Sequence, residues 1–550
     1  MTFPSLRGAA AALMLGSFSA VAAQQQLAKF VPTEVAPGDG FGGSVAVQVP
    51  YLVMGAPFAN AGPNQDAGAV FVFEQGVFDL WFLDDILTAS NGQPFDHLGE
   101  SVAIDGSILV AGAPDTATGG AVYIYTLSGG SWTEIQVLEP TDHPQASDNF
   151  GESVAVSGGR LIGGDPGDDE TASAAGAAYV FAQGIFGIWF EEAKLLASDG
   201  TSFDDFGASV AISGDQALVG APSVTDAFFN QGAAYRYTRT DATGWTESQR
   251  LVASDPNGVA EFGASVALSG TNRAIIGAPG DDEAGPSAGA AYIFEPGVFI
   301  FSWVQVSKLM AADGGAGDNF GTSVGIDGDR AVVGSPEWDA PGGFGSGSAY
   351  LFERVGSSWS PTCHLLRADP ANFDGIGGAV AVEGDLALVA GRFAGPGGET
   401  YLFDADPAPD FYGCSDNPAG SLVEVSGAPE VGGTWTLGVD NPLGTQAPGS
   451  IAYVRITEGA DPNYPCGTPI PGWGMGGPGT TGSILVDISG PEILSGPSIW
   501  DGMNPAPVDF VFPSATFGGR TFFFQGILID PSFSPVPLGL TQAVVACIAP

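Results

Sequence analysis

The stretch FGASVAISGDQALVGAP at residues 206–222 decides the fold, because it encodes two short strands and the turn between them. Val210–Ile212 ends one apolar run, a polar turn follows, and Ala217–Val219 begins a second run. The proline after it has no backbone N–H to donate, so it ends the second strand. Gly232–Tyr237 supplies a third strand and Trp245–Ala253 a fourth. Four antiparallel strands in a unit of about 56 residues predict one blade of a β-propeller.

The same pattern occurs seven times. Each copy has a Phe-Gly-x-Ser-Val-like run, followed by a Gly-Ala-Pro-like stop, and the glycines of the first motif are Gly42, Gly99, Gly151, Gly207, Gly263, Gly321 and Gly377. The seventh copy has diverged from the others, since its motifs read Ile376-Gly377 and Ala390-Gly391-Arg392. Seven phased copies between residues 24 and 408 predict an all-β, seven-bladed β-propeller. The alternative architecture, a stack of separate β-sandwiches, is less favoured because every repeat would then need a hydrophobic core of its own.

This pair of motifs resembles the FG-GAP repeat, which builds the propellers of integrin α-subunits and of many secreted bacterial proteins. The resemblance covers residues 24–408 and implies a seven-bladed propeller. In the family's calcium-binding blades, an Asp-rich loop joins the first two strands. In this chain those positions are turns of two or three residues, such as Ser213-Gly214-Asp215, so the resemblance places no calcium ligand here.

The ring's closure can be read from a missing strand. The fourth strand of the first six repeats carries a tryptophan, at Trp81, Trp132, Trp189, Trp245, Trp303 and Trp359. The seventh repeat has no such strand, but Ala28-Lys29-Phe30 aligns without a gap to Ala193-Lys194-Leu195. We therefore predict that residues 24–33 form the outermost strand of the blade whose other three strands come from residues 374–404.

The first 23 residues read as a signal peptide, with one charge at Arg7, a short apolar run and small residues before Gln24. That run is too short to span a bilayer, and no later run of 18 apolar residues exists. We expect a soluble, secreted protein (extracellular, periplasmic or on the cell surface) that does not span the membrane. The net charge of −46 opposes binding to nucleic acid and anionic lipid.

Basic residues recur at one register of the fourth strand. The chain's only lysines, Lys29, Lys194 and Lys308, lie there, and Arg250 and His364 occupy the same position in two other repeats. The interpretation we favour is that they discourage pairing between exposed blade edges. The alternative is a cationic ring that binds a ligand.

Long acidic loops between the second and third strands indicate where a ligand could bind. Rigid scaffolds present functional residues on such loops. The candidate ligand face consists of Asp168, Asp169, Glu170, Asp281, Asp282, Glu283, Glu337, Trp338 and Asp339.

A second acidic pattern lies between the blades. An aspartate stands three residues before the motif glycine in six repeats, at Asp39, Asp96, Asp148, Asp204, Asp318 and Asp374. Carboxylates are ligands for Ca²⁺, so calcium is a candidate cofactor at these positions. The interpretation we favour is an Asx-turn, in which the carboxylate accepts hydrogen bonds from nearby backbone N–H groups.

Catalytic motifs are missing from the sequence. It has three histidines, of which His97 and His143 stand beside aspartates, and it has no nucleophile elbow, zinc-binding helix or phosphate loop. We expect a non-catalytic binding or adhesion protein, monomeric, with an extracellular protein or glycan as its partner. Two alternatives stay open: a hydrolase or lyase that acts on polysaccharide through a carboxylate pair, and a structural envelope component.

Residues 409–550 differ from the repeats and alternate short strands with turns, which favours a β-sandwich. The four cysteines lie in the last 190 residues of the chain, and disulfides are the expected state outside the cell. Of the three connectivities we weakly favour Cys466–Cys547 with Cys363–Cys414.

Overall fold

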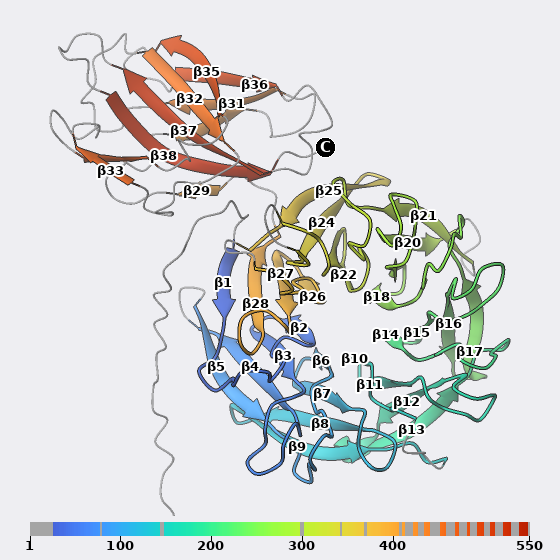
Figure 1. The fold of residues 1–550 in the computed structure, drawn as a ribbon. Coiled ribbons are helices and arrows are strands. Elements are labelled where there is room, and N and C mark those ends of the chain that lie inside the picture. Colours follow the sequence, from blue (N-terminus) through green and yellow to red (C-terminus); the bar gives the residue numbers. More distant parts are fainter. Residues whose placement is uncertain are drawn as a thin grey trace, which may run out of the picture.

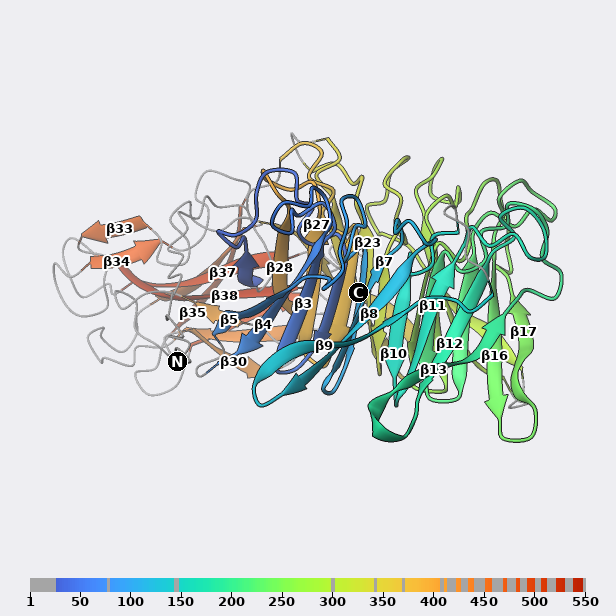
Figure 2. The same ribbon diagram turned by 90° about the horizontal axis from the view of Figure 1, so that it is seen from below.

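The computed structural model describes residues 26–405 apart from 77–79, 143–147, 298–301, 341–343 and 368–370, together with the strands between residues 410 and 547. Seven four-stranded antiparallel sheets are arranged as blades around a central axis (Figure 1). Seen from the side, the blades stand next to one another with long loops along one edge of the ring (Figure 2). The predicted all-β, seven-bladed propeller is confirmed.

Each of the first six blades is built from four consecutive strands. Blade 1 consists of β2 (Val45–Gln48), β3 (Tyr51–Ala56), β4 (Ala69–Gln75) and β5 (Trp81–Leu87). Blade 2 consists of β6 (Ser101–Asp105), β7 (Ile108–Ala113), β8 (Ala121–Ser128) and β9 (Ser131–Leu138). Blade 3 consists of β10 (Val154–Ser157), β11 (Arg160–Asp165), β12 (Ala177–Gln183) and β13 (Trp189–Leu195). A single turn of 3-10 helix, η2 (Ile185–Gly187), joins β12 to β13.

Blades 4 to 6 repeat this order. Blade 4 consists of β14 (Ser209–Ser213), β15 (Gln216–Ala221), β16 (Ala233–Thr240) and β17 (Gly244–Leu251). Blade 5 consists of β18 (Ser265–Ser269), β19 (Arg273–Ala278), β20 (Ala290–Pro296) and β21 (Trp303–Leu309). Blade 6 consists of β22 (Val324–Asp327), β23 (Arg330–Ser335), β24 (Ser348–Val355) and β25 (Ser358–Leu365). The first strand of every blade lies nearest the axis and the fourth lies at the rim (Figure 1).

Blade 7 joins the two ends of the propeller chain. Its inner strands are β26 (Ala379–Glu383), β27 (Leu386–Gly391) and β28 (Glu399–Asp404), and its outer strand is β1 (Gln26–Phe30). β1 runs antiparallel to β28, with Lys29 opposite Tyr401 and Phe30 opposite Thr400. The Phe30 ring is buried 4.8 Å from that of Phe73 in blade 1. The strand that the seventh repeat lacks is therefore supplied from the N-terminal side, as the alignment predicts.

The repeated motif acts at the seam between blades. Its serine hydroxyl donates a hydrogen bond of 2.7 to 2.8 Å to the carbonyl of the next blade's motif glycine, from Ser44, Ser101, Ser153, Ser209, Ser265 and Ser323. A β-carbon on Gly220 would stand 2.0 Å from the carbonyl oxygen of Gly263, so only glycine fits there. Blade 7 has Ala379 at the serine position and lacks this donor at the seam with blade 1.

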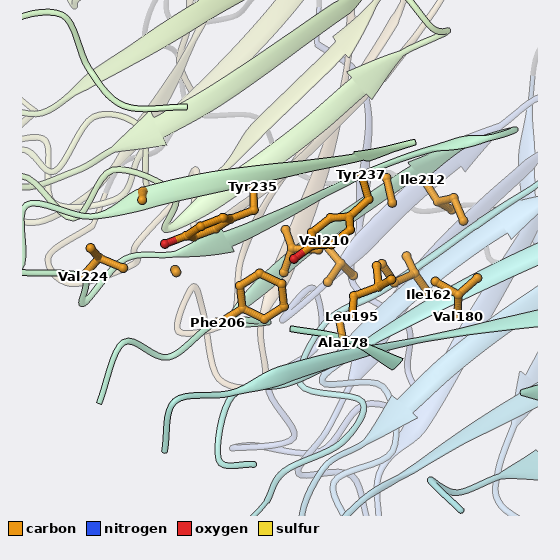
Figure 3. Packing of buried hydrophobic residues seen from close by; sticks show 14 residues of the cluster. Ile162, Ala178, Val180, Leu195, Phe206, Val210, Ile212, Val224, Tyr235 and Tyr237 are labelled. Atoms are coloured by element: carbon orange, nitrogen blue, oxygen red, sulfur yellow. The ribbon is translucent and has the colours of Figure 1, made fainter. Parts of the chain in front are cut away.

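The hydrophobic core is divided among the seams. Between blades 3 and 4, the motif aromatic Phe206 packs against Tyr235 and Tyr237 of blade 4 and lies among Ile162 and Leu195 of blade 3 (Figure 3). All of these side chains are nearly or fully buried. Each motif aromatic thus joins two blades, which explains why it recurs with the period of the fold.

Beyond the propeller, the strands form antiparallel sheets. A five-stranded sheet contains β29 (Asp410–Tyr412), β38 (Leu538–Cys547), β37 (Thr521–Ile529), β32 (Ile451–Thr457) and β35 (Glu492–Ile499); a three-stranded sheet contains β30 (Leu422–Ser426), β31 (Thr434–Val439) and β36 (Ala506–Val511); and β33 (Thr468–Pro471) pairs with β34 (Thr481–Ile484). This is the strand content that the expected β-sandwich requires.

Some predictions fall outside the described part of the chain. Residues 1–23 lie there, as do Cys414 and Cys466, so the signal peptide and the disulfide pairing stay predictions. Within the described residues, no helix is long and apolar enough to cross a membrane.

Candidate ligand-binding face

The acidic loops are tied to the blades by the basic residues of the fourth strands. In blade 3, Lys194 lies opposite Tyr179 in the sheet, and its ammonium contacts carboxylates of Asp142 at 2.5 Å, Asp168 at 2.8 Å and Glu170 at 2.6 Å. The Tyr179 hydroxyl lies 2.9 Å from Asp142 and 3.0 Å from Asp168 and can donate its one proton to either carboxylate. One lysine and one tyrosine thereby hold two different loops together.

The protonation states follow from this arrangement. Burial alone would lower the pKa of Lys194, but its hydrogen bonds to the three carboxylates outweigh burial and raise that pKa above its usual value. For Asp142, burial acts to raise the pKa, yet the hydrogen bonds from Lys194 and Tyr179 leave it below the ordinary value. The cluster is therefore an ion pair network at neutral pH.

Blade 5 repeats the cluster. Lys308 lies opposite Tyr292 and contacts Asp255 at 2.8 Å, Asp281 at 3.0 Å and Glu283 at 2.6 Å. In blades 4, 6 and 7 the same pairs across the strands are Tyr235 with Arg250, Tyr350 with His364, and Tyr401 with Lys29. A carboxylate accompanies each pair: Asp199 and Asp226 with Arg250, Asp313 with His364, and Glu399 with Lys29.

These contacts bear on both interpretations of the basic register. Lys194 and Lys308 anchor loops through the chain's own carboxylates, and Lys29 pairs with Glu399 at the start of the adjacent strand β28, so the three lysines form no cationic ring open to a ligand. That they discourage pairing between blade edges stays a prediction. His364 differs, because burial lowers the pKa of its imidazole to about 4, with Asp313 opposing the shift. It is neutral at pH 7 and stacks on the Tyr350 ring, with centroids 4.0 Å apart.

The predicted ligand-face residues divide into two groups. Asp168 and Asp281 are buried and serve as anchors for the loops. The exposed members are Asp169, Glu170, Asp282, Glu283, Glu337 and Asp339. Trp338 is half-buried against the His364 ring. The loops thus present carboxylates to solvent from a base of buried ion pairs, and the candidates from three blades stay in three separate loops.

The calcium candidates are placed as caps. Five of the six carboxylates accept a hydrogen bond of 2.6 to 2.8 Å from the backbone N–H three residues earlier, at Asp39, Asp96, Asp204, Asp318 and Asp374. The corresponding segment before Asp148 lies outside the described residues. In the described part of the chain, no three His, Cys, Asp or Glu side chains are grouped to hold a metal ion. The carboxylates therefore cap nearby backbone N–H groups, as the favoured interpretation expects, but the donor stands three residues before the aspartate, so the turn is not the predicted Asx-turn, whose donor stands two residues after it.

Sequence reasoning missed a polar group at the mouth of the central axis. Arg392 of blade 7 reaches across to blade 2 and donates to both carboxylate oxygens of Glu100, each at 3.1 Å, while its guanidinium lies over the Phe58 ring of blade 1. Glu152 of blade 3 lies nearby. Its side chain keeps an exposed surface, but partial loss of solvent, with repulsion from Glu100 and Asp115, raises its pKa to about 7. Arg392 replaces the proline of the Gly-Ala-Pro motif in the diverged seventh repeat, and this substitution is the feature of the sequence that could have indicated the contact.

The two histidines singled out for their aspartate neighbours have different outcomes. His97 Nδ1 lies 2.6 Å from Asp115, and the amide of Asn149 donates to the same carboxylate at 3.2 Å. The partner of His97 is therefore Asp115 across the loop, and not its neighbour Asp96. His143 lies outside the described residues.

The architecture and the seam contacts together define a β-propeller whose blades are built from Phe-Gly and Gly-Ala-Pro motifs. The profile of the FG-GAP repeat matches six segments, residues 25–73, 81–125, 132–181, 189–237, 245–294 and 303–352, which together make up more than half of the chain. The chain belongs to the FG-GAP repeat family. The worn seventh blade, split between both ends of the propeller, is not among the matched segments. No curated protein matches the chain.

The lysine cluster of blade 3 can be tested directly. Replacing Lys194 with methionine leaves the carboxylates of Asp142 and Asp168 without their cation, so we expect a loss of about 2 kcal/mol in the free energy of unfolding at pH 7. The loss should shrink as the pH falls through the carboxylate range, where protonation removes the repulsion. Urea unfolding at pH 7 and pH 4 measures both effects, with Lys194→Arg as control. A methionine variant as stable as wild type at pH 7 contradicts this role.

Proposed function

We propose that this protein is a secreted, monomeric, non-catalytic binding protein whose acidic loop face holds an extracellular protein or glycan. The observation that carries the proposal is the anchoring of the acidic loops by Lys194 and Lys308. Loops that are ordered before binding lose less conformational entropy when a partner docks. Propellers of the FG-GAP family, moreover, commonly mediate binding and adhesion.

The exposed acids give the face its character. Asp169 and Asp282 occupy equivalent places in blades 3 and 5, each next to a buried anchor, and each accepts a backbone hydrogen bond that shapes its own loop. Arrays of carboxylates attract cationic groups and repel anionic ones. Partners with positive charge, or glycans that donate hydrogen bonds, fit this surface.

The test compares the two faces of the ring. The double variant Asp169→Lys and Asp282→Lys should lose binding to any partner found in a panel of extracellular proteins and glycans, by at least about tenfold, because two attractive contacts become repulsive. Asp241→Lys is the matched control, since Asp241 is fully exposed in the β16–β17 hairpin on the opposite face. Equal loss in both variants indicates a general charge effect and contradicts the loop-face site.

The alternative, a hydrolase or lyase, is favoured by one observation. Glu152, whose pKa is raised to about 7, lies near the His97–Asp115 pair, and a carboxyl group with that pKa can donate or accept a proton at neutral pH. Turnover of polysaccharides or phosphoesters by wild type, abolished in Glu152→Gln, supports the enzyme. If neither wild type nor Glu152→Gln turns over any substrate, the hypothesis of a binding protein remains. If no binding partner is found either, the hypothesis of a structural envelope component remains.

A further inference from the structure

Three exposed phenylalanines lie together on the loop face where blades 6 and 7 meet. Phe344, Phe373 and Phe393 expose 67%, 71% and 68% of their surface. The backbone N–H of Phe373 donates to the carbonyl of Phe344 at 2.8 Å. A β-carbon at Gly375 would stand 3.7 Å from the Phe393 ring, so all three residues belong to one neighbourhood. We call these three residues the phenylalanine patch.

Phe373 also occupies a backbone conformation that disfavours its side chain. Its φ is 62°, in the left-handed region where a bulky residue is strained. Blades 1 and 6 have Gly38 and Gly317 at this register, with φ of 92° and 89°, and both donate the same backbone hydrogen bond to the preceding loop at 2.8 Å. Glycine would therefore serve the fold equally well. Blades 2 and 4 carry Phe95 and Phe203 at the same register, with φ of 70° and 65°, so three blades share this strained conformation. Phe373 differs from them in having Phe344 and Phe393 beside it.

Acidic residues border the patch. Asp339 accepts the backbone N–H of Gly345 at 2.8 Å, and a β-carbon on Gly345 would lie 3.1 Å from a Glu337 carboxylate oxygen and 3.5 Å from the Phe373 ring. Both carboxylates are exposed. Arg392 donates to Glu100, and its guanidinium also lies over the Phe393 ring, 5.9 Å from the centroid. The patch thus combines apolar rings with exposed carboxylates, which form no ion pair with a basic side chain in the described part of the chain.

Charge decides between the occupants of such a surface. A second copy of this chain carries a net charge of −46, and residues 409–550 contain two basic residues, Arg455 and Arg520, against twelve acids. Both would be repelled by Glu337 and Asp339. A segment with arginine or lysine beside apolar side chains is complementary in both respects, because cations also interact favourably with aromatic faces. Arg392 over the Phe58 ring, 5.0 Å from its centroid, is an example within this protein.

We propose that the phenylalanine patch is the docking surface for a cationic, partly apolar segment of a partner protein. The inference rests on the proposed function and deepens it, because it names the class of partner and the residues that make the apolar contact. The patch supplies the apolar contact, and Glu337 and Asp339 supply the attraction.

The experiment uses two peptides of equal length and charge, one alternating arginine with leucine and the other arginine with serine, at physiological ionic strength. The full-length protein should bind the arginine–leucine peptide about tenfold more tightly, the effect of one well-packed apolar contact. Phe373→Gly should reduce this preference to about twofold or less while leaving the melting temperature unchanged or higher. Phe203→Gly is the matched control, since Phe203 has the same register and a φ of 65° in blade 4, outside the patch. It should leave the preference intact.

Two results would overturn the proposal. One is a peptide preference that survives in Phe373→Gly. The other is a loss of thermal stability in Phe373→Gly well beyond that in Phe203→Gly, which would make the ring a structural element. If wild type binds both peptides equally, and Asp169→Lys with Asp282→Lys weakens both, the patch fails while the acidic face stands. If wild type binds neither peptide, the patch has no cationic partner and the proposal is overturned.

Discussion

Deletion of Gln26–Phe30 should open the ring and cost at least about 3 kcal/mol of unfolding free energy, the size expected for removing one buried phenylalanine alone. The deletion removes the ladder between β1 and β28, the Phe30–Phe73 contact and the 2.9 Å ion pair between Lys29 and Glu399. It also exposes the edge of β28, which can then pair with another molecule. We expect a lower melting temperature and a shift toward aggregates on size exclusion.

A synthetic peptide of residues 24–33 provides the control, because it can occupy the vacant edge without being joined to the chain. Added in excess, it should restore the melting temperature and the monomer in a concentration-dependent way. Phe30→Ala should give an intermediate loss. A deletion variant that melts as wild type does and stays monomeric would show that β1 is dispensable for the ring.

Asp165→Ala should stabilise the protein, and the gain should grow as the pH rises. Asp165 is 1% exposed, and its two carboxylate oxygens have no hydrogen bond partner among the described residues. Burial, with repulsion from Asp148 and Asp168, raises its pKa to about 8, and the nearby Lys194 opposes the shift only in part. Four other blades have a fully buried alanine at this position: Ala56, Ala113, Ala221 and Ala278.

The sign follows from proton binding. Above about pH 4 the unfolded chain releases this proton, whereas the folded protein keeps it until about pH 8, so the free energy of unfolding of wild type falls over that interval relative to the variant. Each pKa unit corresponds to about 1.4 kcal/mol, so the difference reaches several kcal/mol. Urea midpoints at pH 5 and pH 9 measure it, with Asp241→Ala as an exposed control. A pH-independent difference would show that Asp165 is ionised in the fold throughout.

The architecture could be predicted because its determinants repeat. Phe206 and its counterparts fill the seams, and the Gly-Ala-Pro glycines leave room for the neighbouring carbonyl, so each copy of the motif reports the same contact. The closing strand was predictable for the same reason, since Lys29 aligns with Lys194. The acidic loops were found as loops, but the burial of Asp168 and Asp281 was not, because their partners come from other segments of the blade.

Features that join unlike blades left little trace in the sequence. Arg392 and Glu100 are 292 residues apart and meet because blades 7 and 2 face the same axis. The neighbourhood of Phe344, Phe373 and Phe393 likewise depends on three loops from two blades. Asp165 could be seen in the sequence as an exception to the Gly-Ala-Pro motif. The free energy that its ionisation costs the folded state could not be seen there, because that cost arises from its burial. Contacts that recur in every blade can be predicted from a single sequence. A contact that occurs once can be recognised only when the three-dimensional structure is known.

The pairing of β1 with β28 also sets when the molecule can finish folding. The two strands are separated by almost the whole propeller, and pairing at Gln26 and Phe403 requires both to be present. At a synthesis rate of about 5 to 20 residues per second, the first strand waits on the order of 20 to 80 s for its partner. Blades 1 to 6 can assemble in order meanwhile, since each serine needs only the next blade. The N-terminal strand is thus the first part of the propeller to be made and the last to be placed, and its solubility while it waits is a property on which the yield of native protein depends.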